Sequence, residues 1–207
     1  MEDILDVYEM PYDLEHPVVC MDEKPYQLLG DARDPLPMRP GDDLKTDSEY
    51  VREGTCSIFA FTEPLGGVRH VSVREHRTAR DWAEEIQYLV DVSYPDIDKI
   101  ILVMDNLNTH AIASLYKAFP PEDARRIARR LDIHYTPKHG SWLNMCEIEL
   151  NVMTRQCLSR RIDNIDTLKN ELAAWETNRN SETAKISWHF RIKDSREKLI
   201  SLYPKFL

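Results

Sequence analysis

The feature that most constrains this chain is a continuous apolar run at residues 100–104, Ile-Ile-Leu-Val-Met, followed directly by Asp105. A half-buried strand alternates apolar and polar residues, whereas this run is apolar at every position. Such a strand is buried on both faces, as strands are in a parallel sheet that helices cover on both sides. The run therefore predicts an α/β fold with a buried parallel strand.

The segments around this run alternate between strand and helix patterns. Further strands are expected at residues 17–22, 55–62, 68–74 and 132–136, and a short turn at 64–67 predicts a hairpin. Residues 30–50 are rich in proline and aspartate, which predicts a surface loop. Helices are expected at residues 1–16 (with a turn), 78–92, 111–131 (in two pieces, broken at Pro120 and Pro121), 141–161, 165–178 and 194–202. This order favours a mixed sheet with helices on its faces.

Length and composition set the broad class of protein. The chain has 207 residues, of which 42% are hydrophobic, as is usual for a soluble globular protein. No apolar stretch approaches the roughly 20 residues of a membrane-spanning helix, and the acidic N-terminus has no signal-peptide pattern. The four cysteines form no Cys-x-x-Cys pair: Cys20, Cys56, Cys146 and Cys157. We therefore expect a cytoplasmic protein with reduced thiols in its core.

Charge is divided unevenly along the chain. In total, 27 lysines and arginines stand against 36 aspartates and glutamates, and the formal net charge of -9 by itself disfavours a nucleic-acid partner. Residues 1–107 hold 10 basic and 24 acidic residues, a net charge of -14, whereas residues 108–207 hold 17 and 12, a net charge of +5. The second half therefore stays a candidate surface for an acidic partner.

Two carboxylates stand at equivalent places. Asp22 ends the first expected strand and Asp105 ends the apolar run. In an open α/β sheet the ligand crevice lies beyond the carboxyl ends of the strands, so both acids converge there if the two strands are parallel neighbours. Paired carboxylates suit Mg²⁺, which prefers oxygen ligands. For either residue alone, a turn-capping aspartate is an equally good interpretation.

A third acid is expected from the helix after Ser141. Glu147 and Glu149 lie two residues apart, so they point to different sides of a helix and only one of them faces a given site. An apolar stripe at helical spacing defines the buried face: Leu143, Cys146, Leu150, Met153 and Cys157. Glu147 lies beside this stripe, which favours it as the third acid. Glu149 faces away from Glu147, and we expect a solvated charge there.

Three segments together resemble the catalytic domain of DDE transposases, in the bacterial insertion-sequence group related to the mariner superfamily. They are Val-Val-Cys-Met-Asp-Glu-Lys-Pro at 18–25, Ile-Leu-Val-Met-Asp-Asn-Leu-Asn-Thr-His at 101–110, and Tyr-Thr-Pro-Lys-His-Gly-Ser-Trp-Leu-Asn-Met-Cys-Glu-Ile-Glu at 135–149. The resemblance covers most of the chain, from about residue 10 to about residue 205. It implies a ribonuclease-H-like fold with a mixed five-stranded sheet, and a catalytic and metal-binding triad of Asp22, Asp105 and Glu147.

The resemblance also implies a reaction and its partners. Two Mg²⁺ ions, for which Mn²⁺ substitutes, would serve the cutting and joining of double-stranded DNA at the ends of an insertion sequence. TA target sites, a homodimer acting on paired ends and a place in the bacterial cytoplasm, at the nucleoid, are implied in the same way. Relatives carry N-terminal helix-turn-helix domains, and we expect none here because the chain begins almost at the first catalytic strand. We expect one catalytic domain over residues 1–207, with a helical extension from about residue 163.

The motifs that are missing agree with this chemistry. Metal-assisted phosphodiester transfer uses water or a DNA 3′-hydroxyl as the nucleophile, so the protein supplies acids and no activated side chain. The sequence has no Gly-x-Ser-x-Gly elbow, no Walker loop and no catalytic-cysteine signature. His134 and His139 fit His-x4-His, but without an accompanying Cys-x-x-Cys a zinc site is disfavoured.

Several residues near the motifs are candidate DNA contacts. Asn106 and His110 follow the second acid at the family's spacing, and His110 could instead orient a carboxylate or pack. Lys24, Lys138 and Trp142 flank the first and third motifs. Four arginines at helical spacing form a basic edge, suited either to solvent or to DNA phosphates: Arg125, Arg126, Arg129 and Arg130. The other tryptophans are expected in the core: Trp82, Trp175 and Trp188.

Two other functions stay open from the sequence. One is a ribonuclease-H-like nuclease that cuts without joining. The other is a transposase remnant that folds and binds DNA but does not turn over. The intact triad disfavours the remnant. If DNA is the partner, we expect it along the face built by residues 108–207, and we expect weak binding because the body of the protein is acidic.

Overall fold

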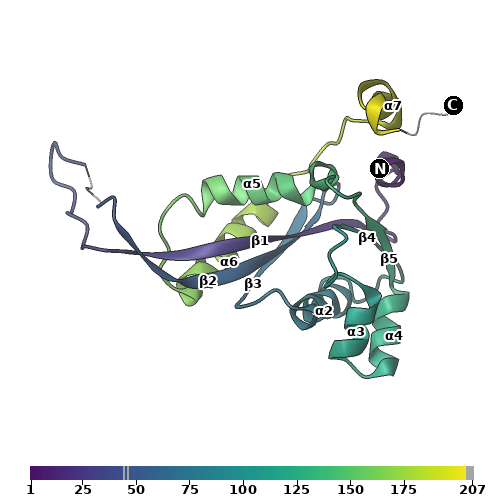
Figure 1. The fold of residues 1–207 in the computed structure, drawn as a ribbon, viewed down its shortest axis with the longest axis horizontal. Helices are drawn as coiled ribbons and strands as arrows, with labels where there is room; N and C mark the ends of the chain where they lie inside the picture. Colours follow the sequence, from purple (N-terminus) through teal and green to yellow (C-terminus); the bar gives the residue numbers. More distant parts are fainter. Residues whose placement is uncertain (44, 46, 204–207) are drawn as a thin grey trace.

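A mixed five-stranded sheet forms the centre of the protein, with strand order β3-β2-β1-β4-β5 (Figure 1). The computed structural model describes residues 1–43, 45 and 47–203. The strands are β1 (Val18–Asp31), β2 (Tyr50–Glu63), β3 (Val68–Arg74), β4 (Ile100–Met104) and β5 (Leu131–Tyr135). The first three strands are mutually antiparallel, and β4 runs parallel to both β1 and β5. The expected hairpin and the expected parallel strand are both confirmed.

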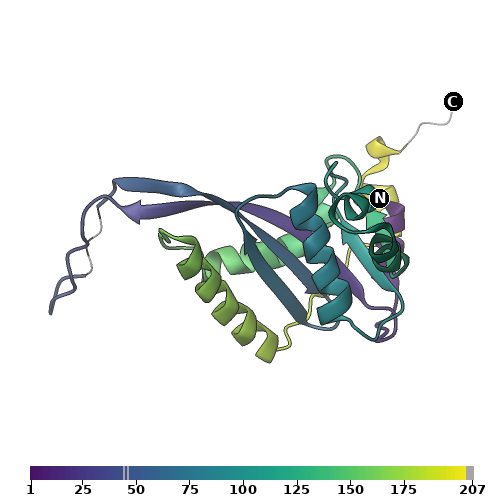
Figure 2. The same cartoon turned by 90° about the horizontal axis from the view of Figure 1, so that it is seen from below.

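Helices cover both faces of the sheet (Figure 2). One face carries α1 (Glu2–Glu9), α5 (Cys146–Gln156) and α6 (Ile165–Ser181). The other carries α2 (Ala79–Tyr88), α3 (Ile112–Ala118) and α4 (Pro121–Arg129). Alternation along β1 divides the two cores, because Cys20 is buried against α5 and α6 whereas Met21 is buried against α2.

Local sequence signals explain where the helices begin. α2 starts after Thr78, whose side chain accepts a hydrogen bond from the Asp81 backbone while the Asp81 carboxylate accepts one from Thr78, a reciprocal capping box. The helix buries Trp82 completely and continues as the π-helical turn Leu89–Ser93. α4 starts at Pro121, since proline fits the first position of a helix and cannot continue a preceding one. The expected break at the two prolines is therefore confirmed.

The first strand is longer than expected. β1 does not end at Asp22 but continues to Asp31, paired with β2 along its whole outer part. Its pairing with β4 ends at Cys20 and Val103, so only β2 accompanies it further. The two strands form an arm that extends away from the body, at the left of Figure 1. The expected loop at 30–50 is therefore confined to the tip of this arm, where Leu36 bridges to Lys45.

The segment after Ser141 is also different, because it is not one helix. A single 3-10 turn, Ser141–Leu143, is followed by Asn144 and then by α5. The expected stripe from Leu143 to Cys157 is buried, as are all four cysteines, which are unpaired. The chain then forms α7 (Ile192–Lys198) and the 3-10 turn Ile200–Leu202. None of the helices in the described part of the chain has the length and apolar character that crossing a membrane requires.

Candidate active site

The first two acids of the predicted triad lie side by side on neighbouring strands. β1 and β4 are parallel and pair Val18 with Ile101 and Cys20 with Val103. The same register continued by two residues brings Asp22 level with Asp105, just beyond the last ladder pair. Both acids therefore stand at the carboxyl end of β4, the edge where ligand sites form in sheets of this kind.

Asp22 lies in an environment that opposes its negative charge. Its Oδ1 accepts a hydrogen bond from the Glu23 backbone at 2.8 Å, and its Oδ2 accepts one from Asn144 Nδ2 at 3.2 Å. Burial, together with the negative charges of Glu147 and Asp105, raises the pKa of Asp22 to about 7. Carboxylates with uncompensated charge at one edge are what a site for a cation requires.

The third acid comes from the first turn of α5. Glu147 is partly exposed and close enough to Asp22 to raise the pKa of that carboxyl. Asn144 sets the start of α5: its Oδ1 accepts from the Cys146 backbone at 3.1 Å while its Nδ2 donates to the Met21 carbonyl at 2.8 Å. Sequence reasoning placed Asn144 in the third motif but missed its role. The signal was an asparagine two residues before the first residue of α5, since asparagine side chains often accept backbone hydrogen bonds where a helix begins.

His110 joins the first two motifs on the face of the sheet that α2 covers, opposite α5. Its Nδ1 lies 2.5 Å from Asp105 Oδ1 and its Nε2 lies 2.9 Å from Glu23 Oε1. The histidine is 1% exposed and stacks on Trp82, with ring centroids 5.9 Å apart. Burial lowers its pKa, but the hydrogen bonds to the two carboxylates outweigh this and raise the pKa to about 9. His110 is therefore a buried bridge between acids, and the sequence did not single out Glu23.

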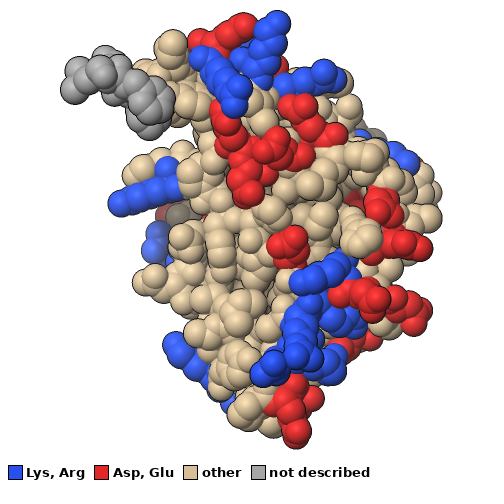
Figure 3. Space-filling model, turned by 90° about the vertical axis from the view of Figure 1, so that its right-hand side faces the viewer, with Lys and Arg blue, Asp and Glu red and all other residues tan. Residues whose placement is uncertain are grey.

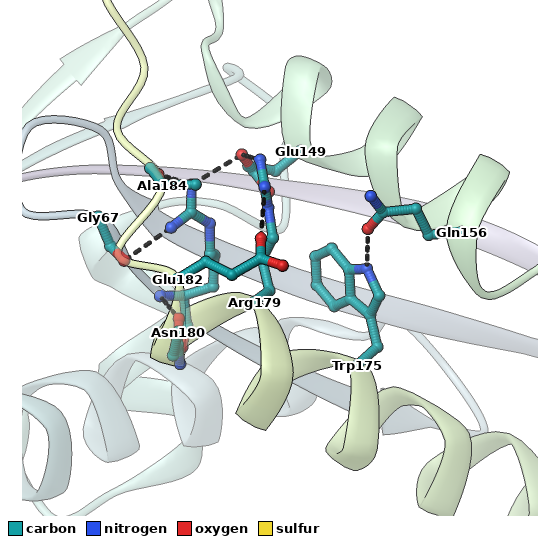
Figure 4. Close-up of polar contacts among 9 residues, drawn as sticks. Gly67, Glu149, Gln156, Trp175, Arg179, Asn180, Glu182 and Ala184 are labelled. Carbon is teal, nitrogen blue, oxygen red and sulfur yellow. Dashed lines mark hydrogen bonds and ion pairs between the residues drawn. The ribbon is translucent and has the colours of Figure 1, made fainter.

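Glu149 corrects one expectation from the sequence. It is not solvated: its side chain is 3% exposed and binds Arg69 Nη2 at 2.8 Å and Arg179 Nη2 at 3.1 Å (Figure 4). Burial raises the pKa of Glu149, but the hydrogen bonds from both arginines outweigh it, and the pKa is lowered. The network joins α5 to β3, α6 and the segment after it, since Arg69 also donates to the Ala184 carbonyl. Glu149 thus anchors the helix that carries Glu147.

The candidate DNA contacts near the motifs are mostly on the surface. Lys24 lies two residues beyond Asp22 in β1, so the two side chains share a face of the strand. Trp142 is 45% exposed and packs its ring edge against Phe190. A cavity of about 390 Å³ lies beside the second acid and is lined by Asp105, Asn106, Leu107, Thr136, Pro137, Lys138, His139, Gly140 and Ser141. This cavity places Asn106 and Lys138 next to the predicted triad.

The four arginines of α4 do not form one free basic edge. Arg126 makes a two-pronged contact with Asp91 at 2.6 and 2.9 Å, and Arg130 donates to the carbonyls of Val90, Tyr94 and Ile97. Both therefore hold α4 against the segment after α2. Arg125 and Arg129 are exposed. Figure 3 shows basic and acidic side chains interspersed on one side of the molecule rather than a single basic surface.

A divalent cation at this edge would need ligands from its substrate as well as from the protein. Within the described residues, no three acidic, histidine or cysteine side chains converge tightly enough to enclose an ion on their own. Mg²⁺ is usually held by one or two carboxylates together with waters and substrate phosphates. Each carboxylate oxygen has two lone pairs, so Asp22 retains acceptor sites beyond the two hydrogen bonds that it makes. The donor set is therefore suited to an ion shared with a phosphate backbone.

The fold and the site define a class of protein: a ribonuclease-H-like domain with acidic residues at the carboxyl edge of its mixed sheet. A family model described as DDE superfamily endonuclease matches residues 17–169, about three quarters of the chain. The chain belongs to this family. No curated protein sequence matches it.

Solved structures of a mariner transposase have the same fold. A Mos1 paired-end complex with Mn is 16% identical with a TM-score of 0.56 and covers 83% of this chain and 51% of that chain. A Mos1 strand transfer complex is 14% identical with a TM-score of 0.59, covering 87% and 53%. The Mos1 catalytic domain is 11% identical with a TM-score of 0.51, covering 87% and 86%. The chain thus spans about half the length of the proteins in the two complexes.

Proposed function

We propose that this chain is the catalytic domain of a transposase that cuts DNA strands at insertion-sequence ends and joins them to a target with divalent metal ions. The observation that carries the proposal is the placement of Asp22 and Asp105 level with each other on parallel neighbouring strands, with Glu147 facing them from α5. Family membership supports it, because the match to DDE endonucleases covers residues 17–169, which include all three acids.

The carboxylates are proposed to hold two Mg²⁺ ions, with Mn²⁺ as a substitute. When bound, such ions would stabilise the charge on the attacking and leaving oxygens of the phosphodiester. Asn144 orients Asp22 through its 3.2 Å hydrogen bond. Because the pKa of Asp22 is about 7, part of the population of this carboxyl must lose a proton before it can act as a ligand.

DNA is proposed to lie across the carboxyl edge of the sheet. Lys24 on β1 and Lys138 beside the cavity flank the acids from the two sides, where they would neutralise backbone phosphates. Asn106 would donate to a phosphate or a sugar, and exposed Trp142 offers a ring for stacking. His110, Arg126 and Arg130 are left out of this DNA surface because their polar groups already bind other residues of the chain.

The assembly and the target are proposed from the relatives. A Mos1 structure is a paired-end complex. From this and from the family resemblance we propose that this chain also acts as a homodimer on two ends and that it joins them at TA target sites. The β1–β2 arm exposes Leu36 and Met38, 63% and 73%, at its tip, which gives a second copy an apolar surface to cover. Action at the nucleoid of a bacterial cytoplasm is part of the same proposal.

Nicking of end-containing duplex DNA in the presence of Mg²⁺ tests the proposal. Asp105→Asn is expected to abolish nicking while the far-UV circular dichroism spectrum stays native, because the change is isosteric. Undiminished nicking by this variant would contradict the metal assignment. Lys117→Gln, a change in α3, serves as a control that is expected to nick normally.

A second assay separates transposase from simple nuclease. Precut ends with a free 3′-hydroxyl are incubated with a supercoiled TA-rich plasmid and Mg²⁺. The proposal predicts covalent joining of the ends to the plasmid. Nicking of intact ends without any joined product would favour a ribonuclease-H-like nuclease instead, and DNA binding without nicking would favour a non-catalytic remnant.

A further inference from the structure

We propose that His110 and Glu23 are positioning residues that hold the Asp105 carboxylate at a fixed spacing from Asp22, so that these two metal ligands are in place before any cation binds. This inference rests on the proposed function, since it assigns a role in the same site. It concerns two side chains that lie on the face of the sheet opposite α5.

The bridge has a defined direction at each end. His110 Nδ1 contacts Asp105 Oδ1 at 2.5 Å, and His110 Nε2 contacts Glu23 Oε1 at 2.9 Å. Both ring nitrogens face carboxylates, so both donate when the ring carries two protons. This contact engages Asp105 Oδ1 and leaves Oδ2 free to take a cation. Carboxylate–histidine pairs of this kind orient metal ligands in many proteins.

The bridge lies where the backbone stops holding the two strands together. The last ladder pair between β1 and β4 is Cys20 with Val103, so the backbones at Asp22 and Asp105 lie beyond it. Glu23 is on β1 and Asp105 directly follows β4, and His110 joins them across this gap. At the level of the metal ligands, the two strands are therefore connected by the side-chain bridge instead of by backbone hydrogen bonds.

His110 is itself held in place. Its carbonyl accepts a hydrogen bond from the Tyr135 hydroxyl at 3.0 Å, and its backbone N–H donates to Leu107 at 2.9 Å. Trp82, fully buried in α2, stacks against the ring. Because contacts with its own loop, with β5 and with α2 fix the ring, the ring cannot shift to follow the Asp105 carboxylate. The ring therefore sets the position of Asp105.

Glu23 depends on His110 in turn. Its side chain is 3% exposed, and its Oε2 is buried without a hydrogen-bond partner in the described structure. A buried carboxylate with one orphaned oxygen is costly, and the contact with His110 is what compensates it. The burial of a glutamate directly after the first acid is better explained by its contact with His110 than by packing.

Titration of the protein with Mn²⁺ alone, read by electron paramagnetic resonance of the free ion and without DNA, tests the inference. His110→Gln places an amide donor near the Nε2 position, so it keeps the hydrogen bond to Glu23 but loses the one to Asp105. His110→Asn places its amide donor near the Nδ1 position, so it keeps the hydrogen bond to Asp105. His134→Gln is the matched control, because His134 also contacts an aspartate, Asp3, at 2.9 Å but lies outside the bridge.

Mn²⁺ affinity is expected to fall about 10- to 100-fold in His110→Gln, less in His110→Asn, and not at all in His134→Gln. Thermal unfolding is measured alongside, because a purely structural role would lower the melting temperature without this order of affinities. A folded His110→Gln protein that binds Mn²⁺ as tightly as the wild type would overturn the inference. If that variant folds poorly, Glu23→Gln replaces it, with weakened affinity expected and unchanged affinity again decisive against the bridge.

Asp105→Asn separates this inference from the proposed function. If Asp105→Asn loses Mn²⁺ binding but His110→Gln does not, the metal assignment holds and the positioning role is wrong. If wild type and Asp105→Asn bind Mn²⁺ equally, the metal assignment itself is wrong and the inference falls with it. If neither binds Mn²⁺ without DNA, the ligands are not in place before the substrate arrives and the inference is wrong.

Discussion

The buried network around Glu149 makes the sharpest prediction about stability. Glu149→Gln removes the only negative charge that the structure places between Arg69 and Arg179, within the described residues. The glutamine oxygen could accept from one arginine, but its NH₂ group would face donors of the other. Arg69 is 1% exposed at its side chain, so its charge would be left buried without a counter-charge.

The expected cost follows from this burial. Breaking a buried pair by removing one partner typically costs about 3–5 kcal/mol of unfolding free energy. For a chain of this size, each kcal/mol shifts the melting temperature by about 2–4 °C, so the expected drop is about 6–20 °C. Differential scanning calorimetry at pH 7, supported by urea unfolding at 25 °C, measures it.

Glu147→Gln is the matched control, because it makes the same chemical change two residues away on the same helix. Glu147 is partly exposed and has no side-chain hydrogen bond within the described structure, so its stability change should stay within about 0.5 kcal/mol. Nicking activity, in contrast, should be lost in Glu147→Gln even though its stability hardly changes. Equal melting temperatures for Glu149→Gln and wild type would refute the argument that this network anchors α5.

Three further predictions concern charge. Because Asp22 has a pKa of about 7, Mn²⁺ affinity should rise steeply between pH 6 and pH 8 and level off above, as isothermal titration calorimetry would show; a flat profile would contradict the assignment. The unfolded aspartate ionises near 3.8, so the unfolded state binds fewer protons between about pH 4 and 7 and stability falls with rising pH there. Asp22→Asn should therefore raise the free energy of unfolding of the metal-free protein by about 2 kcal/mol at pH 8, after allowing for the weakened contact with Asn144. At pH 4 the same change should have hardly any effect. A lower free energy of unfolding for the variant in urea at pH 8 would contradict this prediction. Lys138→Gln should lower the salt dependence of DNA binding by about one phosphate contact, and an unchanged salt slope would remove Lys138 from the DNA surface.

Local patterns in the sequence account for much of the fold. The apolar run at 100–104 is a strand buried between two parallel neighbours, and the break at Pro121 follows from the chemistry of proline. The level placement of Asp22 and Asp105 follows from the parallel pairing of β1 with β4, although β1 itself continues beyond Asp22. These features depend on residues close together in the chain or on the rules of parallel sheets, so they could be predicted.

The features that the sequence did not reveal depend on distant partners. Glu149 is buried because Arg69 lies 80 residues away and Arg179 lies 30 residues away, and no spacing rule indicates either contact. The outer half of β1 persists as a strand because β2 pairs with it after β4 has ended. Glu23 meets His110 across 87 residues, so the bridge became visible only once β1 and β4 were adjacent.

The central claim is that three carboxylates at this edge bind the catalytic metal ions. Crystals of the protein with a DNA end, soaked in Mn²⁺ and measured at the manganese absorption edge, test it most directly. We expect anomalous peaks between Asp22, Asp105 and Glu147, with DNA phosphate oxygens completing the coordination. Manganese bound elsewhere, with these carboxylates left without metal, would contradict it.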